Sequence, residues 1–391
     1  MTDAGNGVDA ARPLTGVQVL DFTVNLPGPY ASFLLASLGA EVIKVEPPRG
    51  DPARHMEPMF TFLNRGKRSV VLDLREQTTR PALRALAGRA DVLLEGFRPG
   101  VMGRLGCDWE TARRWNPRLI YCSISAHGQE GPRVHQPGHD LNLQALAGVC
   151  HLERDAHGTP RGSLLPVADL STSLVAVASV CAALAARGPE GEGRYLDVAM
   201  SDAVLSWAHI WGEGIDLGAQ AREALGSGPA GKVVARTLLQ QMDREKLYTM
   251  PHYGVYRTRD RRWLALGIVD EKHFWQGLCE ATGLGRLAKL SLSARIAGNP
   301  FFRRLFAVIL RRRNLEDWLT RFEEAGVPAT PVLRPEETKQ EAQFLARGMF
   351  DREGRVRAPL PDARHPQRPA PALGEHTEQV LAELDLSEVA S

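Results

Sequence analysis

The stretch GVQVLDFTVNLPGPYASFLLASLGAEVIKVE, residues 16–46, contains three elements in succession. Apolar residues alternate over 16–22, and this period of two predicts a strand. A small-residue, apolar run over 27–40 follows, with Pro29 near its start and Gly39 near its end, which is typical of a helix. EVIKVE (41–46) predicts a second strand. A strand, a helix and a strand in this order predict parallel pairing through a right-handed crossover.

The alternation continues along the chain. Further strands are predicted at SVVLDL (69–74), ADVLLEGF (90–97), RLIYCSIS (118–125) and YLDVAM (195–200), with helices over about 77–89 and 109–115. Strands that alternate with helices predict the α/β class, here a Rossmann-like large domain with a parallel sheet. The first strand-to-helix turn reads LPGPY and lacks the Gly-x-Gly-x-x-Gly pattern, so we do not expect an ordinary dinucleotide site.

The length of 391 residues exceeds one ordinary core and predicts two domains. We expect a disordered lead-in over 1–12 and the N-terminal part of the large domain over 13–217. A crossing linker of weak periodicity follows over 218–250, and a smaller α+β domain over 251–325 begins with a hairpin. Residues 326–391 are expected to start with a return strand (326–333), to complete the large domain and to end in an arm rich in Pro and Arg.

Charge and cysteine usage exclude several classes of protein. Lys and Arg number 48 against 46 Asp and Glu, whereas a general nucleic-acid binder is usually markedly basic. The five scattered cysteines contain no Cys-x-x-Cys pair, which argues against a disulfide framework and a structural zinc site. We therefore expect reduced thiols in a cytoplasmic protein. The N-terminus lacks the apolar stretch of a signal peptide, and the longest nearly apolar run, 174–186, is too short to span a bilayer, so no membrane association is expected.

Two acidic positions stand at the start of predicted helices. Asp169 in LLPVADLSTS (164–173) precedes a long apolar run, and Asp is a good helix cap. A carboxylate there also lies in the positive end of the helix dipole, stays ionised, and in a site can attack an activated carbonyl. His139 and Asp140 in PGHDLNLQALAG (137–148) likewise have a plain interpretation as a turn residue and a cap. The residues alone leave both interpretations open.

The chain resembles the class III CoA-transferase family, which includes formyl-CoA transferase, carnitine CoA-transferase and 2-methylacyl-CoA racemase. The order and spacing of the matching segments hold from residue 13 to about residue 335. These segments are PLTGVQVLDF (13–22), LPGPYASFLLASLGAEVIKVEPPRGD (26–51), NRGKRSVVLDL (64–74), ADVLLEGFRPGVMGRLG (90–106), NPRLIYCSISAHGQEGP (116–132), PGHDLNLQALAG (137–148), LLPVADLSTS (164–173), GEGRYLDVAMSDAVL (191–205) and AGVPATPV (325–332).

The resemblance implies an interlocked homodimer whose large domain is built from both ends of the chain. It implies an acyl-CoA and a small carboxylic acid as substrates, with no separate cofactor and no metal. The family's nucleophilic aspartate falls on Asp169. Its CoA-contacting positions fall on Leu26, Pro27, Leu72, Arg75, Gly96, Phe97 and Arg104. Guanidinium groups suit the phosphates of CoA, although Arg75 and Arg104 also have an interpretation as solvated charges at helix ends.

Two chemistries occur on this scaffold. In CoA transfer, Asp169 attacks the thioester carbonyl and passes through a mixed anhydride and an aspartyl-CoA thioester. In racemisation, two groups exchange protons on opposite faces of the carbon next to the thioester. The racemases share the sequence Gly-His-Asp, found here at 138–140, which favours His139 and Asp169 as an acid–base pair, with Asp270 as the third acid.

Two departures separate this chain from the racemases. The racemases follow the aspartate with an Asp-x-x-Gly-Gly turn, whereas this chain has Asp-Leu-Ser-Thr-Ser (169–173). Their later glutamate is replaced by Asp270, with Glu271 next to it. We therefore favour CoA transfer, in which His139 orients the thioester carbonyl or the acceptor acid and Asp140 fixes His139. Racemisation is the alternative, and a catalytically silent CoA-binding protein is a third possibility.

Overall fold

The computed structural model describes residues 12–153, 155, 157–189, 191–213, 250–364, 366 and 368–384, with the side chains of 211–213 excepted. The predicted lead-in and crossing linker lie outside the described residues, apart from their last positions. The chain divides into two compact units. Unit 1 comprises Met1–His151, Gly162–Ile210 and Ala342–Ser391, and unit 2 comprises Leu152–Arg161 and Trp211–Glu341.

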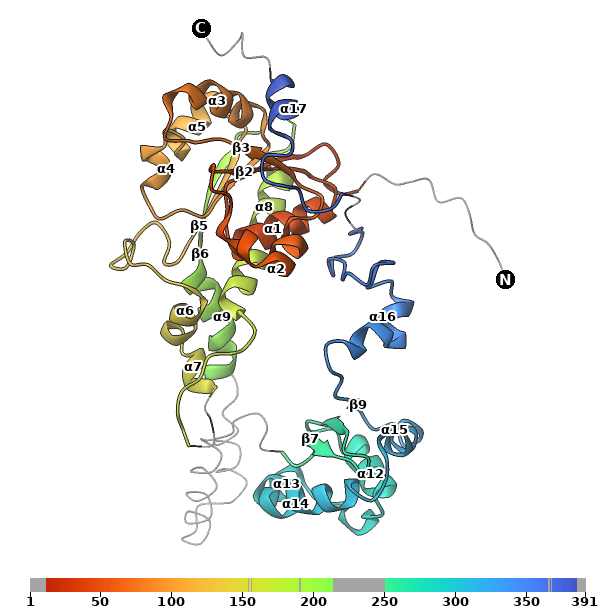
Figure 1. Ribbon diagram of the computed structural model, residues 1–391. Helices are drawn as coiled ribbons and strands as arrows, with labels where there is room; N and C mark the ends of the chain where they lie inside the picture. The colour runs from red at the N-terminus through yellow and green to blue at the C-terminus, as the bar shows by residue number, and fades with distance from the viewer. Residues whose placement is uncertain are drawn as a thin grey trace. The chain divides into compact units, whose positions relative to one another are not determined.

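Unit 1 is built on a six-stranded parallel sheet in the order β3-β2-β1-β4-β5-β6 (Figure 1). The strands are β1 (Gln18–Asp21), β2 (Glu41–Glu46), β3 (Arg68–Val71), β4 (Val92–Glu95), β5 (Ile120–Ser125) and β6 (Arg194–Ala199). Each lies on a predicted strand, and the predicted α/β class with a parallel sheet is confirmed. The strand order reverses where β1 pairs with both β2 and β4, which is where ligands of such sheets bind.

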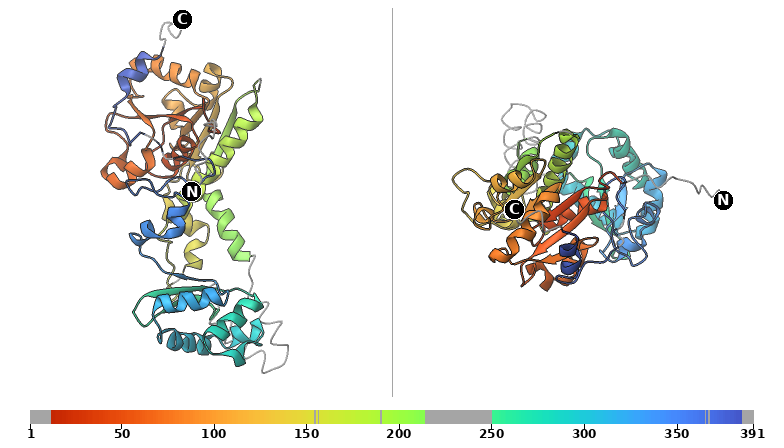
Figure 2. Two further views of the ribbon diagram at one scale, coloured as in Figure 1. Left: turned by 90° about the vertical axis from the view of Figure 1, so that its right-hand side faces the viewer. Right: turned by 90° about the horizontal axis from the view of Figure 1, so that it is seen from above.

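Helices cover both faces of this sheet (Figures 1 and 2). The helices that lie wholly or mainly in unit 1 are α1 (Pro27–Ser37), α2 (Glu57–Asn64), α3 (Arg80–Arg89), α4 (Val101–Arg104), α5 (Trp109–Trp115), α6 (Asp140–Leu146), α7 (Val149–Leu152), α8 (Val167–Arg187), α9 (Met200–Glu213), α16 (Ala342–Ala346) and α17 (Thr377–Ala382). Successive strand residues point to opposite faces. Val19 accordingly packs with Phe33 of α1, whereas Leu20 packs with Leu83 of α3 on the other side.

Helix α8 (Val167–Arg187) is longer than the predicted apolar run of 174–186. By length and composition alone, it is long and apolar enough to cross a membrane. Its residues Ala176, Val177 and Val180 are buried in the core between the sheet and α1. This packing accounts for the apolar composition of α8, since a helix that covers the middle of a sheet buries a wide face.

The C-terminal segment returns to unit 1. The backbone N–H of His376 donates to the carbonyl of Ser69 at 2.9 Å, and Thr377 accepts from the N–H of Val71 at 3.0 Å. The guanidinium of Arg68 forms an ion pair with Glu383 at 2.7 Å. Segments from both ends of the chain therefore meet at the β3 edge of this sheet.

Unit 2 contains an antiparallel sheet in the order β7-β8-β9. Its elements are β7 (Tyr253–Arg257), β8 (Trp263–Gly267), α12 (Lys272–Ala281), α13 (Leu292–Ala297), α14 (Asn299–Leu310), α15 (Leu315–Glu324) and β9 (Ala329–Pro331). The predicted hairpin is β7–β8. The predicted return strand over 326–333 forms β9, but its ladder runs to β8, with Leu266 opposite Ala329. The predicted boundary after residue 325 is therefore too early, because pairing with β8 keeps this strand in unit 2, which extends to Glu341.

Candidate active site

A cleft of about 230 Å³ lies in unit 1 at the carboxyl ends of β1, β4 and β5. This position matches the topological switch point of the sheet. The cleft is lined by Thr23, Val24, Asn25, Pro27 and Gly28 after β1, by Gly96, Phe97, Arg98 and Pro99 after β4, by Ile124, Ser125 and Ala126 at the end of β5, and by Val134, Gln136, Pro137, Gly138, His139, Asp169 and Met200.

Asp169 occupies the first turn of α8 and reaches this cleft half-buried. Its carboxylate oxygens accept no hydrogen bond from any described residue. Burial, together with the negative charge of Asp140, raises the pKa of Asp169 from 3.8 to about 7. We expected the helix dipole to keep this carboxylate ionised. The pKa is raised instead, chiefly because burial disfavours the charged form and in addition because the carboxylate of Asp140 lies at the N-terminal amides of α8.

That second carboxylate is Asp140. Its Oδ1 accepts from the backbone N–H groups of Ala168 at 2.8 Å and Asp169 at 3.3 Å, and its Oδ2 accepts from the side chain of Gln144. Asp140 therefore caps α8, a helix 28 residues away, although it stands in the first turn of α6. We expected Asp140 to fix the side chain of His139. Among the described residues no hydrogen bond joins these two side chains, because both carboxylate oxygens of Asp140 bind the other groups just named.

His139 precedes α6 and is exposed, and its backbone N–H donates to Asn142 at 3.0 Å. It lines the same cleft as Asp169, so the structure brings these two predicted catalytic residues to one site. Asp270 belongs to unit 2, where its largely exposed carboxylate lies 3.7 Å from the guanidinium of Arg295.

The predicted CoA-contacting positions divide into two groups. Pro27, Gly96 and Phe97 line the cleft, and Leu26 stands next to Pro27 as the N-cap residue of α1. Three others do not line it. Leu72 is buried in the core, Arg75 is 77% exposed and forms an ion pair with Asp73 at 2.7 Å, and Arg104 is an exposed residue that donates to the carbonyl of Gly100 at 3.3 Å.

Reasoning from sequence missed the cleft residues Asn25 and Arg98, and also Glu95, which supports the turn that carries Arg98. Arg98 is exposed in the cleft, and its guanidinium has no partner in the described part of the chain. Glu95 is buried at the end of β4 and accepts a hydrogen bond from the N–H of Phe97 at 2.8 Å, which fixes the turn that carries Phe97 and Arg98. Burial raises the pKa of Glu95 to about 7. Glu95 is the last residue of the buried parallel strand β4 and Arg98 lies in the turn that follows it, and this position is the signal that could have identified both residues.

Buried charges support the turn after β1. Lys67 donates to Asp21 at 3.2 Å and to the carbonyl of Pro29 at 3.1 Å, and both side chains are fully buried. Thr23 packs so closely against Gly28 that a Cβ at Gly28 would lie 2.2 Å from the Cβ of Thr23. Glycine is therefore required where the chain enters α1.

The same turn is tied to the helix of Asp169. The hydroxyl of Ser173, which is fully buried one turn after Asp169, lies 2.7 Å from the carbonyl of Pro27 and 2.8 Å from the carbonyl of Asp169. One wall of the cleft and the helix that presents the carboxyl group therefore form a connected structure.

Comparisons with known proteins show which family the chain resembles along nearly its whole length. The model of CoA-transferase family III matches residues 14–377. The chain is 32% identical over 418 aligned positions to a succinate–glutarate CoA-transferase of Agrobacterium fabrum (strain C58), with 99% of each chain covered. It is also 32% identical to the human alpha-methylacyl-CoA racemase, covering 96% of this chain and 94% of the racemase. A crystal structure of a CAIB/BAIF family protein from Brucella suis superposes with a TM-score of 0.78 at 29% identity, covering 96% of this chain and 100% of that one.

Proposed function

This chain belongs to CoA-transferase family III, and from that membership we propose that it transfers coenzyme A from an acyl-CoA to a small carboxylic acid. The reaction would take place in the cleft of unit 1, with Asp169 as the nucleophile. Dicarboxylic acids such as succinate and glutarate are the first acceptors and donors to examine, because a relative 32% identical to this chain is named for them.

One observation carries the proposal. Asp169 presents a carboxyl group to the cleft without a hydrogen-bond partner among the described residues, and its pKa is raised to about 7. A structural carboxylate in a half-buried place is normally paired, whereas a perturbed and unpaired one in a cleft is typical of a functional site. The raised pKa lets both the protonated and the ionised form occur near neutral pH, and burial leaves the ionised form poorly solvated, which suits a nucleophile.

The chemistry proceeds by exchange at acyl carbons. An oxygen of ionised Asp169 attacks the thioester carbonyl, the C–S bond breaks, and CoA leaves as the thiolate, with a mixed anhydride on Asp169. The thiolate then attacks the aspartyl carbonyl, which releases the donor acid as a carboxylate and leaves an aspartyl-CoA thioester. The acceptor carboxylate repeats the two steps in reverse, so that Asp169 is regenerated and no net proton is consumed.

Other residues of the cleft have supporting roles in this proposal. The guanidinium of Arg98, which is exposed in the cleft, suits a phosphate of CoA, because guanidinium groups bind phosphate oxygens in a bidentate way. The ring of Phe97 offers an apolar surface for adenine or pantetheine. His139, exposed at the cleft, is placed to donate to the thioester carbonyl or to the acceptor acid.

The experiment that tests the proposal traps the covalent intermediate. The purified chain is incubated with succinyl-CoA and hydroxylamine at pH 8, and the peptide that contains Asp169 is examined by mass spectrometry for a hydroxamate. We expect the hydroxamate in the wild type and its absence in Asp169→Asn. If glutaryl-CoA forms from succinyl-CoA and glutarate while Asp169→Asn retains full activity, the assignment of Asp169 as nucleophile is wrong.

Racemisation remains the second candidate, since His139 and Asp169 line one cleft and a racemase is among the relatives. Against it, the positions of the racemase glycine turn carry side chains here. Thr172 is buried and donates to the carbonyl of Ala168 at 2.6 Å, so these positions are used to pack α8. A chiral 2-methylacyl-CoA incubated in D₂O without an acceptor acid distinguishes the two activities. Racemisation incorporates deuterium at the α-carbon, and CoA transfer does not.

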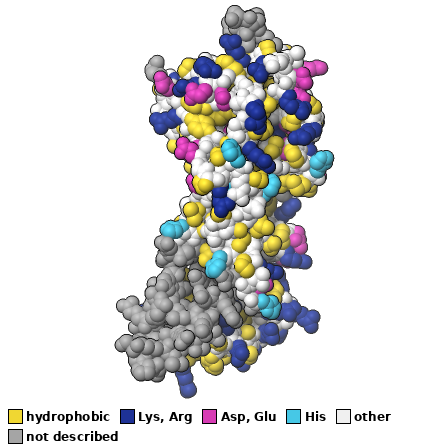
Figure 3. Space-filling model, turned by 90° about the vertical axis from the view of Figure 1, so that its left-hand side faces the viewer, with side chains coloured by type: hydrophobic (Ala, Val, Ile, Leu, Met, Phe, Trp, Pro, Cys, Tyr) yellow, Lys and Arg dark blue, Asp and Glu magenta, His cyan; other side chains and the backbone are white. Residues whose placement is uncertain are grey.

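We also propose that two copies of the chain form the interlocked homodimer that the family resemblance implies. Unit 1 exposes large apolar side chains on α6, α8, α9 and the segment before α8. They are Leu141, Leu146, Leu164, Leu165, Leu174, Leu205, Trp207 and Ile210. Hydrophobic side chains also lie exposed between charged ones in the view of Figure 3. Association of two copies would cover apolar surface of this kind. Sedimentation velocity of the full chain tests this proposal.

We place the enzyme in the cytoplasm. All five cysteines are free thiols, and four of them, Cys107, Cys122, Cys150 and Cys279, are buried. Free thiols are the normal state in a reducing compartment.

A further inference from the structure

Asn25 is a polar residue of the cleft that no role assigned so far explains. It lines the same cleft as Asp169 and is half-buried. Its side-chain amide makes no hydrogen bond to any part of the chain that the structure describes. An Asn side chain carries two N–H donors and one carbonyl acceptor, and at Asn25 these groups stand in the cleft uncommitted to the described residues. They are therefore available to a bound substrate.

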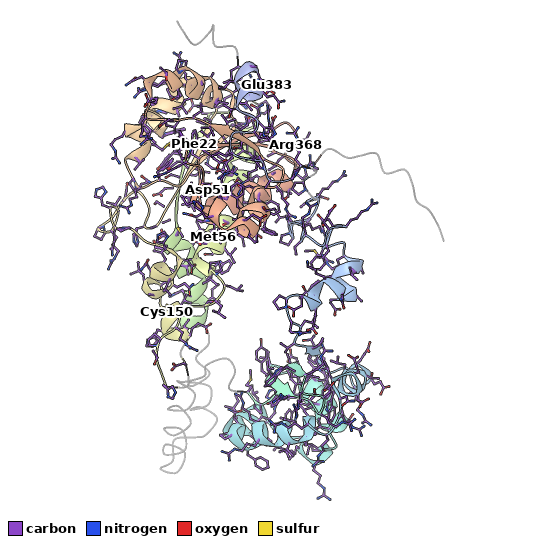
Figure 4. All side chains as sticks on the ribbon, viewed as in Figure 1. Phe22, Asp51, Met56, Cys150, Arg368 and Glu383 are labelled. Carbon is purple, nitrogen blue, oxygen red and sulfur yellow. The ribbon has the colours of Figure 1, made fainter. Side chains whose placement is uncertain are left out.

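The backbone of Asn25 is held in an uncommon conformation. Its φ of 63° lies in the left-handed region, which non-glycine residues seldom occupy. Its N–H donates to Oδ1 of Asp51 at 3.1 Å, and Oδ2 of Asp51 lies 2.9 Å from Nζ of Lys44. Lys44 also donates to the carbonyl of Thr23 at 2.8 Å. Asp51, labelled in Figure 4, and Lys44 are both buried inside unit 1.

These contacts hold the backbone of the turn that carries Asn25. Buried charges hold the backbone on both sides of the residue, and the contact of Thr23 with Gly28 limits the turn further. Such a conformation persists only where its surroundings determine it, and residues of this kind gather at functional sites. Asn tolerates the left-handed region, which explains why it is allowed at this position. Glycine would adopt this left-handed conformation at a lower conformational free energy than Asn does. Backbone geometry alone therefore does not explain why this position carries an amide side chain.

We propose that Asn25 is a substrate-binding residue, whose amide N–H donates to a carbonyl or carboxylate oxygen of the acyl group that reacts at Asp169. This inference rests on the proposed function. The oxygen belongs either to the thioester carbonyl of the donor or to the carboxylate of the acceptor acid, which present the same acceptor chemistry to an amide. A neutral donor at this place aligns the acyl carbon and leaves the negative charge of Asp169 intact. A lysine at the same place would neutralise that charge.

Two variants separate the amide from the backbone that carries it. Asn25→Gly keeps the left-handed conformation and removes the side chain. Asn25→Asp keeps the shape and replaces the N–H donor with an oxygen that repels a carboxylate. Asn314→Asp, at the start of α15 in unit 2, is the matched control for a loss of one Asn amide. Thermal unfolding of each variant shows whether the fold is retained.

The full chain is assayed at pH 8 with succinyl-CoA as donor and glutarate as acceptor. We expect Asn25→Asp to lower kcat/KM by about tenfold or more for the substrate whose oxygen is bound, with a smaller loss for Asn25→Gly. A loss confined to the rate of hydroxamate formation with succinyl-CoA alone identifies the thioester carbonyl. A loss confined to the KM of glutarate identifies the acceptor carboxylate.

Binding measurements keep this inference separate from the proposed function. If the wild type transfers no CoA, the proposed function fails, and calorimetry with succinyl-CoA and with free CoA then tests Asn25 alone. We expect Asn25→Asp to weaken succinyl-CoA binding and to leave free CoA binding unchanged. The inference is overturned if both variants stay within about twofold of the wild type in every assay, or if they weaken free CoA as much as succinyl-CoA.

Discussion

The carboxylate of Asp140 accepts a hydrogen bond from the backbone N–H of Asp169 at 3.3 Å, so two acidic residues share the first turn of α8. One of them caps the helix and the other faces the cleft. The cap therefore also acts on the reactive group, because its negative charge adds to the effect of burial on the pKa of Asp169. Asp140 therefore has the capping role that its sequence position suggests, but on α8 and not on its own helix, and the nucleophilic role of Asp169 stays a proposal.

The first prediction concerns pH and activity. Because Asp169 must be ionised to attack and its pKa is about 7, kcat/KM is expected to rise with pH and to level off above about 7. Asp140→Asn removes the negative charge but keeps an oxygen that accepts from Ala168. The pH profile of this variant should therefore shift to lower pH. At pH 5.5 the variant should retain a larger fraction of its own plateau activity than the wild type does. An unchanged profile would mean that the charge of Asp140 does not reach Asp169.

The second prediction concerns stability. The pKa of Asp169 is raised in the folded state above its unfolded value of 3.8, so the folded state binds the proton more tightly. The group therefore lowers the free energy of unfolding as pH rises from about 4 to about 7. Asp169→Asn should be more stable than the wild type by ~1–3 kcal/mol at pH 8, with no difference below pH 4. Urea unfolding at the two pH values measures this, with the exposed Glu324→Gln as the control.

Local patterns were enough to predict the parallel sheet. Each strand from β1 to β6 is an apolar run bounded by glycine, proline or polar residues, and such runs depend little on distant parts of the chain. The same patterns do not reveal which element a strand pairs with. β9 was predicted correctly as a strand but placed in the wrong unit, because its partner Leu266 lies about sixty residues before it.

The site was predicted less completely than the fold. Asp169 and His139 were identified from their place in motifs, and the structure brings them to one cleft. The cap on α8 was assigned to Asp169 because local sequence shows only the nearest acid, whereas Asp140 reaches it from another helix. Asn25 and Arg98 lie in turns whose importance depends on the neighbouring strands. A search for polar residues directly after every buried parallel strand would have included Arg98.

The third prediction concerns the buried ion pair beneath the turn after β1. Burial raises the pKa of Asp21, but Lys67 and Lys44 outweigh it and lower the pKa to about 2. Lys67→Met leaves Asp21 as a buried charge without its partner at 3.2 Å and should lower the free energy of unfolding by ~3–5 kcal/mol. The double variant Asp21→Asn with Lys67→Met should regain part of this loss. If the double variant is as unstable as the two losses added together, the pair is not coupled.

The fourth prediction compares three arginines as phosphate ligands for CoA. Arg98 lines the cleft without a partner in the ranges that the structure describes, whereas Arg75 is engaged with Asp73 at 2.7 Å and Arg104 lies at the end of α4. A lost charge-assisted hydrogen bond costs ~1.5–3 kcal/mol, so Arg98→Ala should weaken CoA binding by about 10- to 100-fold. The weakening should shrink at high salt, because a charge contact is screened.

Calorimetry with free CoA at two ionic strengths measures this weakening. Arg75→Ala is the matched control and should change the Kd by less than about threefold. A larger effect for Arg75→Ala than for Arg98→Ala would return the phosphate site to the position that the family resemblance implies and would remove Arg98 from it.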